Sequence, residues 1–308
     1  MPRVTVCMAV YNGKETIEAA LESVVAQTYQ DFRIIVLDDG SSDDSISRVE
    51  KFDATTISVP NGGLGAARKR LVEEADGELI AFIDRDDLWL PEKLEREVAH
   101  LDFTGADLVH ADGWYVYEGG GEVARNLAID PATHAFEHIL PNNRIIASSV
   151  LFKRDAMLAA GNFVSETPRC SDWYGWMMMA RKFKFAHLAE KLVRYNVLST
   201  SLANSGYRFH ESQYKLITEH FLPRRAELFG ALSPADRNRY RRTLVRDAGI
   251  ALSAMARHKK RDGEPILARK LAIEAIKISP DVLRVWTRAL SVCMSDTLQR
   301  RGGNLGSP

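Results

Sequence analysis

The chain has 308 residues, enough to bury a substantial core in one large domain or in two smaller ones. It contains 41 Lys and Arg against 41 Asp and Glu, and this zero net charge excludes a protein drawn to nucleic acid by its overall charge, so any anion site must be local. Three widely separated Cys fit neither a disulfide framework nor paired zinc ligands, and they indicate a reducing compartment.

The N-terminal segment predicts no secretory signal, because its apolar run ends at Tyr11, too early for a signal-peptide core followed by a cleavage site. No stretch approaches the roughly 18 uninterrupted apolar residues typical of a membrane span. We therefore expect a cytoplasmic protein that can contact the inner face of the membrane peripherally.

The first hundred residues alternate between segments typical of strands and segments typical of helices. Strands are predicted at 4–10, 32–37, 56–59 and 79–83, and helices over 17–25, from the turn after Ser42 to about Phe52, over 64–74 and over 91–101. Apolar strands separated by helices predict a mostly parallel α/β sheet that is covered on both faces and binds ligands at the carboxyl ends of its strands.

Beyond residue 105 the pattern changes twice. Strand-like segments at 107–117 and 145–152, followed by a helix over 173–182, predict that 106–204 completes the domain begun by 1–105. From 205 to 300, apolar residues at helical spacing predict a C-terminal helical region. Its expected breaks lie near Pro223, Ser233-Pro234, Asp262-Gly263 and Ser279-Pro280, and residues 301–308 are predicted to be disordered.

The strongest chemical signal is the run Asp84-Arg85-Asp86-Asp87, which follows the apolar end of a predicted strand. Because like charges so close together repel, a positive group should offset them. Mg²⁺ or Mn²⁺, held by one or two carboxylates and by substrate phosphates, would do so. The alternative is a solvated acidic turn that caps the following helix.

Two further turns lie at predicted strand ends. Asp38 and Asp39 could accept hydrogen bonds from a pyrimidine imide or from ribose hydroxyls, or could simply cap a helix. The segment 61–68 places glycines and free backbone N–H groups at a helix start, with Arg68 one turn in, which suits a diphosphate. It matches neither the dinucleotide fingerprint nor a P-loop, which argues against an NAD-dependent oxidoreductase.

Four motifs, in this order and spacing, resemble the family 2 glycosyltransferases of GT-A fold: Met8 to Asn12, Leu37 to Asp43, Asn61 to Arg68 and Ile83 to Asp87. Ser148 to Arg154 and Gly161 to Phe163 also resemble that family's acceptor-side strand and the turn after it. The resemblance covers residues 3 to about 203 and implies a GT-A nucleotide-diphospho-sugar transferase domain over 1–204.

The resemblance implies roles for individual residues. Tyr11 and Asp39, with Asp38, would hold the nucleotide base, and Arg68 would lie near the donor phosphates or ribose. Asp84 and Asp86 match the family's DxD motif, in which the first carboxylate faces the ribose and the second the metal, and together they form the predicted metal site. The donor-binding set is Ala9, Tyr11, Asp38, Asp39, Asn61, Gly65, Arg68, Asp84 and Arg85.

Asp172 is the predicted catalytic residue. It occupies the place of the aspartate in the family's Glu-Asp pair, which looks like the general base acting on the acceptor hydroxyl, although it could also cap the following helix. The family's preceding Glu is Ser171 here. The later Arg-x-His pattern is replaced by the segment ending at Leu198, so the family's histidine is missing.

The resemblance implies an inverting, metal-dependent glycosyltransferase of polysaccharide or glycoconjugate assembly, whose donor is a nucleotide-diphosphate sugar. The placement of Asp38 and Asp39 favours a UDP- or dTDP-linked donor. Its acceptor would be a carbohydrate or a lipid-linked glycan, and the basic C-terminal helices could contact an anionic membrane. The main alternative, motivated by Ser171 and Leu198, is a weakly active or inactive nucleotide-sugar-binding protein of the same fold. A nucleotidyltransferase-like enzyme is a further alternative.

Overall fold

The computed structural model describes residues 1–125, 135–140, 143–165, 169–198, 207–230 and 232–302, with side chains as far as Cys293. The chain divides into two compact units, Met1–Ser199 and Thr200–Pro308. Its three cysteines are free, as the sequence predicts.

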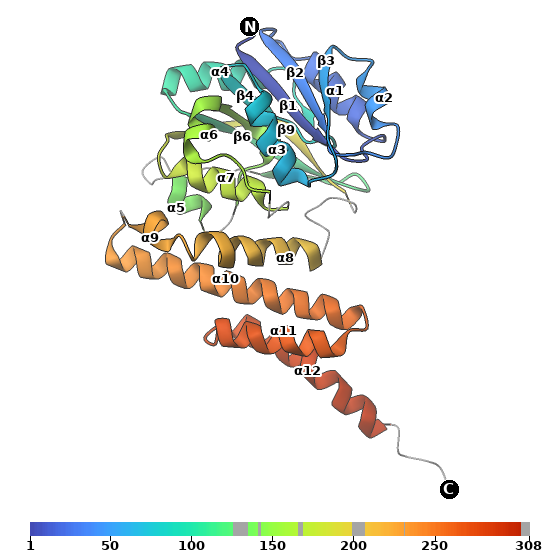
Figure 1. Ribbon diagram of the computed structural model, residues 1–308, viewed down its shortest axis with the longest axis vertical. Coiled ribbons are helices and arrows are strands. Elements are labelled where there is room, and N and C mark those ends of the chain that lie inside the picture. Colours follow the sequence, from blue (N-terminus) through green and yellow to red (C-terminus); the bar gives the residue numbers. More distant parts are fainter. Residues whose placement is uncertain (126–134, 141–142, 166–168, 199–206, 231, 303–308) are drawn as a thin grey trace. The chain divides into compact units, whose positions relative to one another are not determined.

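In its described residues the first unit is built on a nine-stranded mixed sheet. Figure 1 shows this sheet with its flanking helices. Strands β1, β2, β3 and β4 pair in parallel, whereas β8 joins β4 to β6 in antiparallel fashion and β6 and β9 run parallel again. Across the sheet the order is β3 (Ala54–Ser58), β2 (Phe32–Asp38), β1 (Val4–Val10), β4 (Leu79–Phe82), β8 (Val150–Lys153), β6 (Leu108–Tyr117), β9 (Phe185–Val197) and β5 (Leu88–Trp89), with β7 (Glu122–Arg125) on β6.

Helices cover both faces of this sheet, because its apolar strands need cover on each side. The described helices of the unit are α1 (Ile17–Val25), α2 (Ser45–Val49), α3 (Leu64–Glu74), α4 (Lys93–Thr104), α5 (Ala135–Ile139), α6 (Arg154–Ala160) and α7 (Ser171–Ala180). Helices α1 and α4 contribute to one core cluster, whereas α3, α6 and α7 contact one another (Figure 1).

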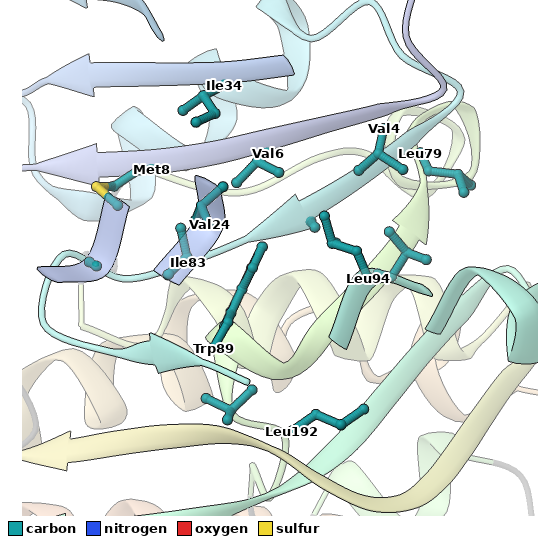
Figure 2. Packing of buried hydrophobic residues seen from close by; sticks show 14 of the residues in the cluster. Val4, Val6, Met8, Val24, Ile34, Leu79, Ile83, Trp89, Leu94 and Leu192 are labelled. Atoms are coloured by element: carbon teal, nitrogen blue, oxygen red, sulfur yellow. The ribbon is translucent and has the colours of Figure 1, made fainter. Parts of the chain in front are cut away.

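The alternation of side chains along the strands decides which helix each residue meets. Val4 and Val6 of β1 pack in the cluster that contains α1 and α4, whereas Cys7 lies on the other face with its Sγ 4.0 Å from the carbonyl of Leu71 in α3. Figure 2 shows the first of these clusters, in which Trp89 joins the strand residues. This packing fixes the strand ends that carry the polar motifs.

The predicted alternation of strands and helices over the first hundred residues is confirmed, with shifts of a few residues at element ends. One predicted strand is wrong at its start. The segment predicted as a strand from Ile145 begins its strand only at Val150, because residues 147–149 form a 3₁₀ turn in which Ser149 Oγ donates to the carbonyl of Ile146 at 2.9 Å. Strand β9 was not predicted at all.

The second unit is helical, as predicted. It contains α8 (Tyr207–Lys215), a π-helical turn (Leu216–Phe221), α9 (Arg225–Phe229), α10 (Pro234–Arg261), α11 (Pro265–Ile278) and α12 (Leu283–Gly302). Ser233 caps α10 by accepting from the N–H of Asp236 at 3.1 Å, and Gly263 takes a left-handed φ of 80° after its end. Small buried residues such as Ala268 and Ala272 let α10, α11 and α12 pack closely.

The helices end near each predicted break. Helix α12 reaches Gly302, and residues 303–308 of the predicted tail lie outside the described residues. Within the described part of the chain, no helix is both long enough and apolar enough to cross a bilayer.

Candidate functional site

The polar motifs converge at the carboxyl ends of three neighbouring strands. Strand β1 lies between β2 and β4, with Val10 opposite Asp38 and Cys7 opposite Phe82 in the parallel register. The chain therefore leaves β1, β2 and β4 at the same edge of the sheet, where open α/β sheets bind ligands.

The region predicted for the base contains one exposed aromatic ring. Tyr11 follows β1 and is 50% exposed, so its ring is available to stack on a ligand, and Ala9 lies opposite Leu37 in the sheet. Asp38 accepts a hydrogen bond from the N–H of Ser41 at 2.8 Å, which shapes the loop after β2. Asn12 has a φ of 50°, and its N–H donates to Ser41 Oγ, which joins the loop after β1 to the loop after β2.

Asp39 forms hydrogen bonds with backbone N–H groups of the glycine turn. Its two carboxylate oxygens accept from the N–H groups of Gly62 at 2.7 Å and Gly63 at 2.8 Å, and the Asn61 side chain donates to its carbonyl at 2.9 Å. The expectation of free N–H groups at this turn is therefore wrong for Gly62 and Gly63. Because a carboxylate oxygen has two lone pairs, Asp39 can still accept from a further donor.

Gly65 allows two segments to approach closely. A Cβ atom at this position would lie 2.2 Å from the carbonyl oxygen of Val164 and 3.2 Å from Cβ of Ser171. A glycine is needed here to let α3 reach the start of α7, which carries Asp172. The geometry thus gives Gly65 a clear packing role.

Arg68 is buried and pairs with the first aspartate of the acidic run. Its Nη2 lies 2.9 Å from Oδ1 and 3.2 Å from Oδ2 of Asp84, and its guanidinium lies 5.8 Å from the centre of the Phe82 ring. Burial lowers the pKa of Arg68, but the charges of Asp84 and Asp172 outweigh it and raise the pKa overall. Arg68 is therefore the positive group that the acidic run requires.

The last aspartate of the run is fully buried and fixed by two residues distant in sequence. Asp87 accepts from the Ser148 hydroxyl and, at 3.0 Å, from the N–H of Asn196, and Ser148 Oγ also accepts from the N–H of Asp84 at 2.9 Å. Burial and the charges of Asp84 and Asp86 raise the pKa of Asp87 well above its usual range. Asp87 therefore holds the turn in shape and is not open to a ligand.

Asp86 is the carboxylate of the run that remains available. It accepts no hydrogen bond from another described residue, and burial together with the charge of Asp84 raises its pKa. Among the described residues, no three His, Cys, Asp or Glu side chains gather as a metal-binding group. One unpaired carboxylate beside a second still fits a hard cation whose remaining ligands are phosphate oxygens and water.

Arg85 extends toward the loop between β1 and α1. Its side chain packs on Gly13, where a Cβ atom would lie 2.6 Å from Arg85 Cδ, and its Nη1 lies 3.5 Å from Thr16 Oγ1. This cation borders the same strand edge as Asp84.

Asp172 lies in the first turn of α7, where a carboxylate is favoured by the helix dipole. Burial raises its pKa, although Arg68 and a 2.7 Å hydrogen bond from Asn143 Nδ2 act in the opposite direction. A raised pKa suits a carboxylate that accepts a proton during a reaction. The neighbouring Ser171 is fully buried, and its hydroxyl has no hydrogen-bond partner among the described residues.

Sequence reasoning assigned no function to three residues that hold this site, namely Asn143, Ser148 and Asn196. Asn196 donates through Nδ2 to the carbonyl of Asp86 while its own N–H binds Asp87. A signal existed for Asn196, because it lies in the segment that departs from the family pattern. Ser148 begins the segment 148–154 that resembles the family's acceptor-side strand, but that resemblance implies no role for its side chain, and Asn143 lies in no such segment.

Comparisons with known proteins identify the family of the chain. The family model described as glycosyl transferase family 2 matches residues 5–163. The Escherichia coli UDP-Glc:alpha-D-GlcNAc-diphosphoundecaprenol beta-1,3-glucosyltransferase WfgD is 23% identical over 220 residues, which cover 70% of this chain and 85% of that protein.

Two solved structures show a similar fold at low sequence identity. Residues 1–349 of S. aureus TarS in complex with UDP-GlcNAc align with a TM-score of 0.67 at 17% identity, over 99% of this chain and 93% of that one. The mannosyltransferase PcManGT from Pyrobaculum calidifontis, in complex with GDP-Man and Mn²⁺, aligns with a TM-score of 0.56 at 17% identity, over 98% and 88% of the chains.

Proposed function

Because this chain belongs to glycosyl transferase family 2 and has the GT-A fold, we propose that it transfers a sugar from a nucleotide-diphosphate donor to an acceptor hydroxyl with inversion at the anomeric carbon. The observation that carries this proposal is the position of Arg68. Its guanidinium forms a hydrogen-bonded ion pair with Asp84, and the charge of Asp172 raises its pKa. One buried cation therefore interacts with both the acidic run and the candidate base. Transfer of a sugar requires the donor site and the acceptor-side base to lie close together, as the acidic run and Asp172 do around Arg68.

The donor would bind at the strand edge formed by β1, β2 and β4. The exposed ring of Tyr11 would stack on the base, and Asp38 and Asp39 would accept from the base or ribose. Ala9 and Asn61 border the same edge. Carboxylates at this position favour a UDP or dTDP sugar, since both pyrimidines carry an imide N–H.

Asp86 would hold a divalent metal together with the donor diphosphate, with Asp84 beside it. Bound Mn²⁺ or Mg²⁺ would supply positive charge to the leaving diphosphate. Arg68 and Arg85 add cationic groups of the chain itself near this edge. The Mn²⁺ in the PcManGT complex supports a metal site in this fold.

Asp172 would act as the general base. Its carboxylate would take the proton of the acceptor hydroxyl as that oxygen attacks the anomeric carbon, and the nucleotide diphosphate would leave from the opposite side. Asn143 would hold the carboxylate in place through its hydrogen bond to Oδ2. Because Arg68 offsets part of its charge, Asp172 can be ionised although it is largely enclosed.

The acceptor is proposed to be a carbohydrate or a lipid-linked glycan. The relative WfgD acts, by its name, on a diphosphoundecaprenol-linked sugar, and the Bacillus subtilis relative TuaG is named as a putative teichuronic acid biosynthesis glycosyltransferase. A cytoplasmic protein with peripheral contact to the inner face of the membrane would meet such an acceptor.

A second candidate function is the binding of a nucleotide sugar with little or no turnover. The observation that favours it is the unpartnered hydroxyl of Ser171, which stands where the family has a glutamate. The absence of the family's histidine at Leu198 points the same way.

The test separates binding from turnover. Titration calorimetry with UDP and dTDP, with and without Mn²⁺, would measure donor binding, and a panel of nucleotide sugars would be assayed for transfer and donor hydrolysis. We expect Asp172→Asn to lower kcat by about 10²- to 10⁴-fold while nucleotide binding is kept. Binding without turnover in the unaltered protein would favour the second candidate, and unchanged transfer by the variant would remove Asp172 from its proposed role.

A further inference from the structure

We propose that the helical unit binds an anionic lipid bilayer through the α11 face, which consists of Ile266, Lys270, Ile273 and Lys277. This inference rests on the proposed function, which it deepens by naming the surface that would meet the membrane. Its test needs no turnover.

The first observation is the separation of charge between the two units. Thr200–Pro308 contains 20 Lys and Arg against 10 Asp and Glu, whereas Met1–Ser199 contains 21 against 31. The neutral total therefore conceals a strongly basic second unit. Such a unit is attracted to a surface of negative charge within about a Debye length.

The second observation is the spacing of residues on α11. The four residues of the α11 face follow one another at intervals of four, three and four, so they lie on one side of the helix. Ala268, Ala272 and Ala275 are fully buried on the opposite side. The α11 face thus points away from the core of its own unit.

The third observation is that this face mixes exposed apolar and unpaired basic side chains. Ile266 is 74% exposed and Ile273 is 51% exposed, and neither Lys270 nor Lys277 forms a salt bridge with another described residue. On this exposed face the isoleucines would insert at the membrane interface, and the lysines would extend toward the headgroups.

Exposed apolar side chains are concentrated in this part of the chain. Of the twelve large hydrophobic side chains that are exposed among the described residues, six lie between Ile266 and Leu290. Helix α12 contributes Leu283, Trp286 and Leu290, and Trp is typical of membrane interfaces. A symmetric dimer through the α11 face would instead bring like charges together.

The experiment measures cosedimentation of the full chain with vesicles of equimolar phosphatidylglycerol and phosphatidylcholine, and with vesicles of phosphatidylcholine alone. We expect binding to the anionic vesicles that weakens as salt rises. Lys270→Glu with Lys277→Glu should weaken it at least about 25-fold, since each basic residue contributes a factor of about five. Ile266→Ser with Ile273→Ser should weaken it about tenfold.

The matched control is Arg241→Glu with Arg242→Glu on α10, two exposed residues whose reversal changes net charge equally. We expect this control to lose much less binding. An equal loss in the control, no loss in the isoleucine variant, or no binding to anionic vesicles would overturn the proposal. The proposal would also be overturned if sedimentation velocity showed that the unaltered chain is an oligomer, that this oligomer does not bind vesicles, and that the α11 substitutions dissociate it.

Nucleotide binding in buffer without vesicles separates this proposal from the proposed function. The α11 variants should keep it, and circular dichroism should show unchanged helix content. Vesicle binding that fails while transfer activity persists would overturn the membrane surface alone. If the unaltered protein binds vesicles but neither binds nucleotide nor transfers sugar, the proposed function alone would be overturned.

Discussion

Asn143 donates a 2.7 Å hydrogen bond from Nδ2 to Oδ2 of Asp172, across 29 residues of sequence. The same asparagine accepts from the N–H of Ile145 through Oδ1, so its amide is fixed at both ends. This contact stabilises the charged form of a carboxylate whose pKa burial raises.

We expect Asn143→Ala to move the acidic limb of the pH profile of kcat/KM to higher pH. The base must be ionised, and loss of the donor raises the pKa of Asp172 further, so activity is lost at a higher pH as the solution is acidified. At neutral pH kcat should fall about tenfold.

Asn143→Asp separates positioning of the base from support of the loop. It keeps the acceptor for Ile145 but puts a negative charge beside Asp172, so its acidic limb should move further than that of Asn143→Ala. Asn143 would only support the loop if Asn143→Asp lowered kcat less than Asn143→Ala and left the acidic limb of the pH profile unmoved.

Asn196→Ala should raise the Mn²⁺ concentration needed for half-maximal activity by about 10- to 100-fold. The variant loses the bond to the carbonyl of Asp86 but keeps the backbone bond to Asp87, so the turn loosens around the available carboxylate. Nucleotide binding without metal should change little. Arg194→Ala on the same strand removes an exposed contact with Glu122 and serves as the control. Equal metal dependence in both variants would contradict the role given to Asn196.

Gly65→Ala should lower the free energy of unfolding by about 1–3 kcal/mol, because its Cβ would meet the carbonyl oxygen of Val164 at 2.2 Å. The loss is expected although Ala favours a helix over Gly by about 1 kcal/mol. Gly121→Ala, where a Cβ would meet nothing within 4 Å, should be close to neutral. Denaturant unfolding measures both, and equal stability of the two variants would show that α3 adjusts freely.

Lys93 and Glu97 form a fully buried ion pair of 2.6 Å, and Lys93 Nζ lies 4.1 Å from the centre of the Trp89 ring. Burial raises the pKa of Glu97 to about 7 despite Lys93. We expect Lys93→Met or Glu97→Leu alone to cost about 3–5 kcal/mol, because each leaves one uncompensated buried group.

The double variant Lys93→Met with Glu97→Leu should recover most of this loss, since it removes both charges and fills their volume with apolar atoms. Urea unfolding of the single and double variants completes the cycle. Additive losses in the double variant would show that the two residues act independently.

The local features follow from the amino-acid sequence. Apolar runs and turn residues predicted strands β1 and β4, the second with its end one residue late, and Ser233-Pro234 and Asp262-Gly263 marked the ends of α10. These signals are readable because capping, turn geometry and side-chain periodicity depend on neighbours a few residues apart. The order of four such motifs then predicted the family.

How the motifs meet depends on contacts between segments that are distant in sequence. Asp39 accepts hydrogen bonds from N–H groups of the glycine turn, and Asn196 donates to the carbonyl of Asp86, 110 residues away in sequence. Strand β9 is stabilised by its long pairing with β6. Side-chain hydrogen bonds between distant segments leave no periodic trace in sequence, and β9 lacks the clean alternation that a half-buried strand shows. The available carboxylate of the acidic run, Asp86, is distinguished from Asp84 and Asp87 only by these long-range contacts.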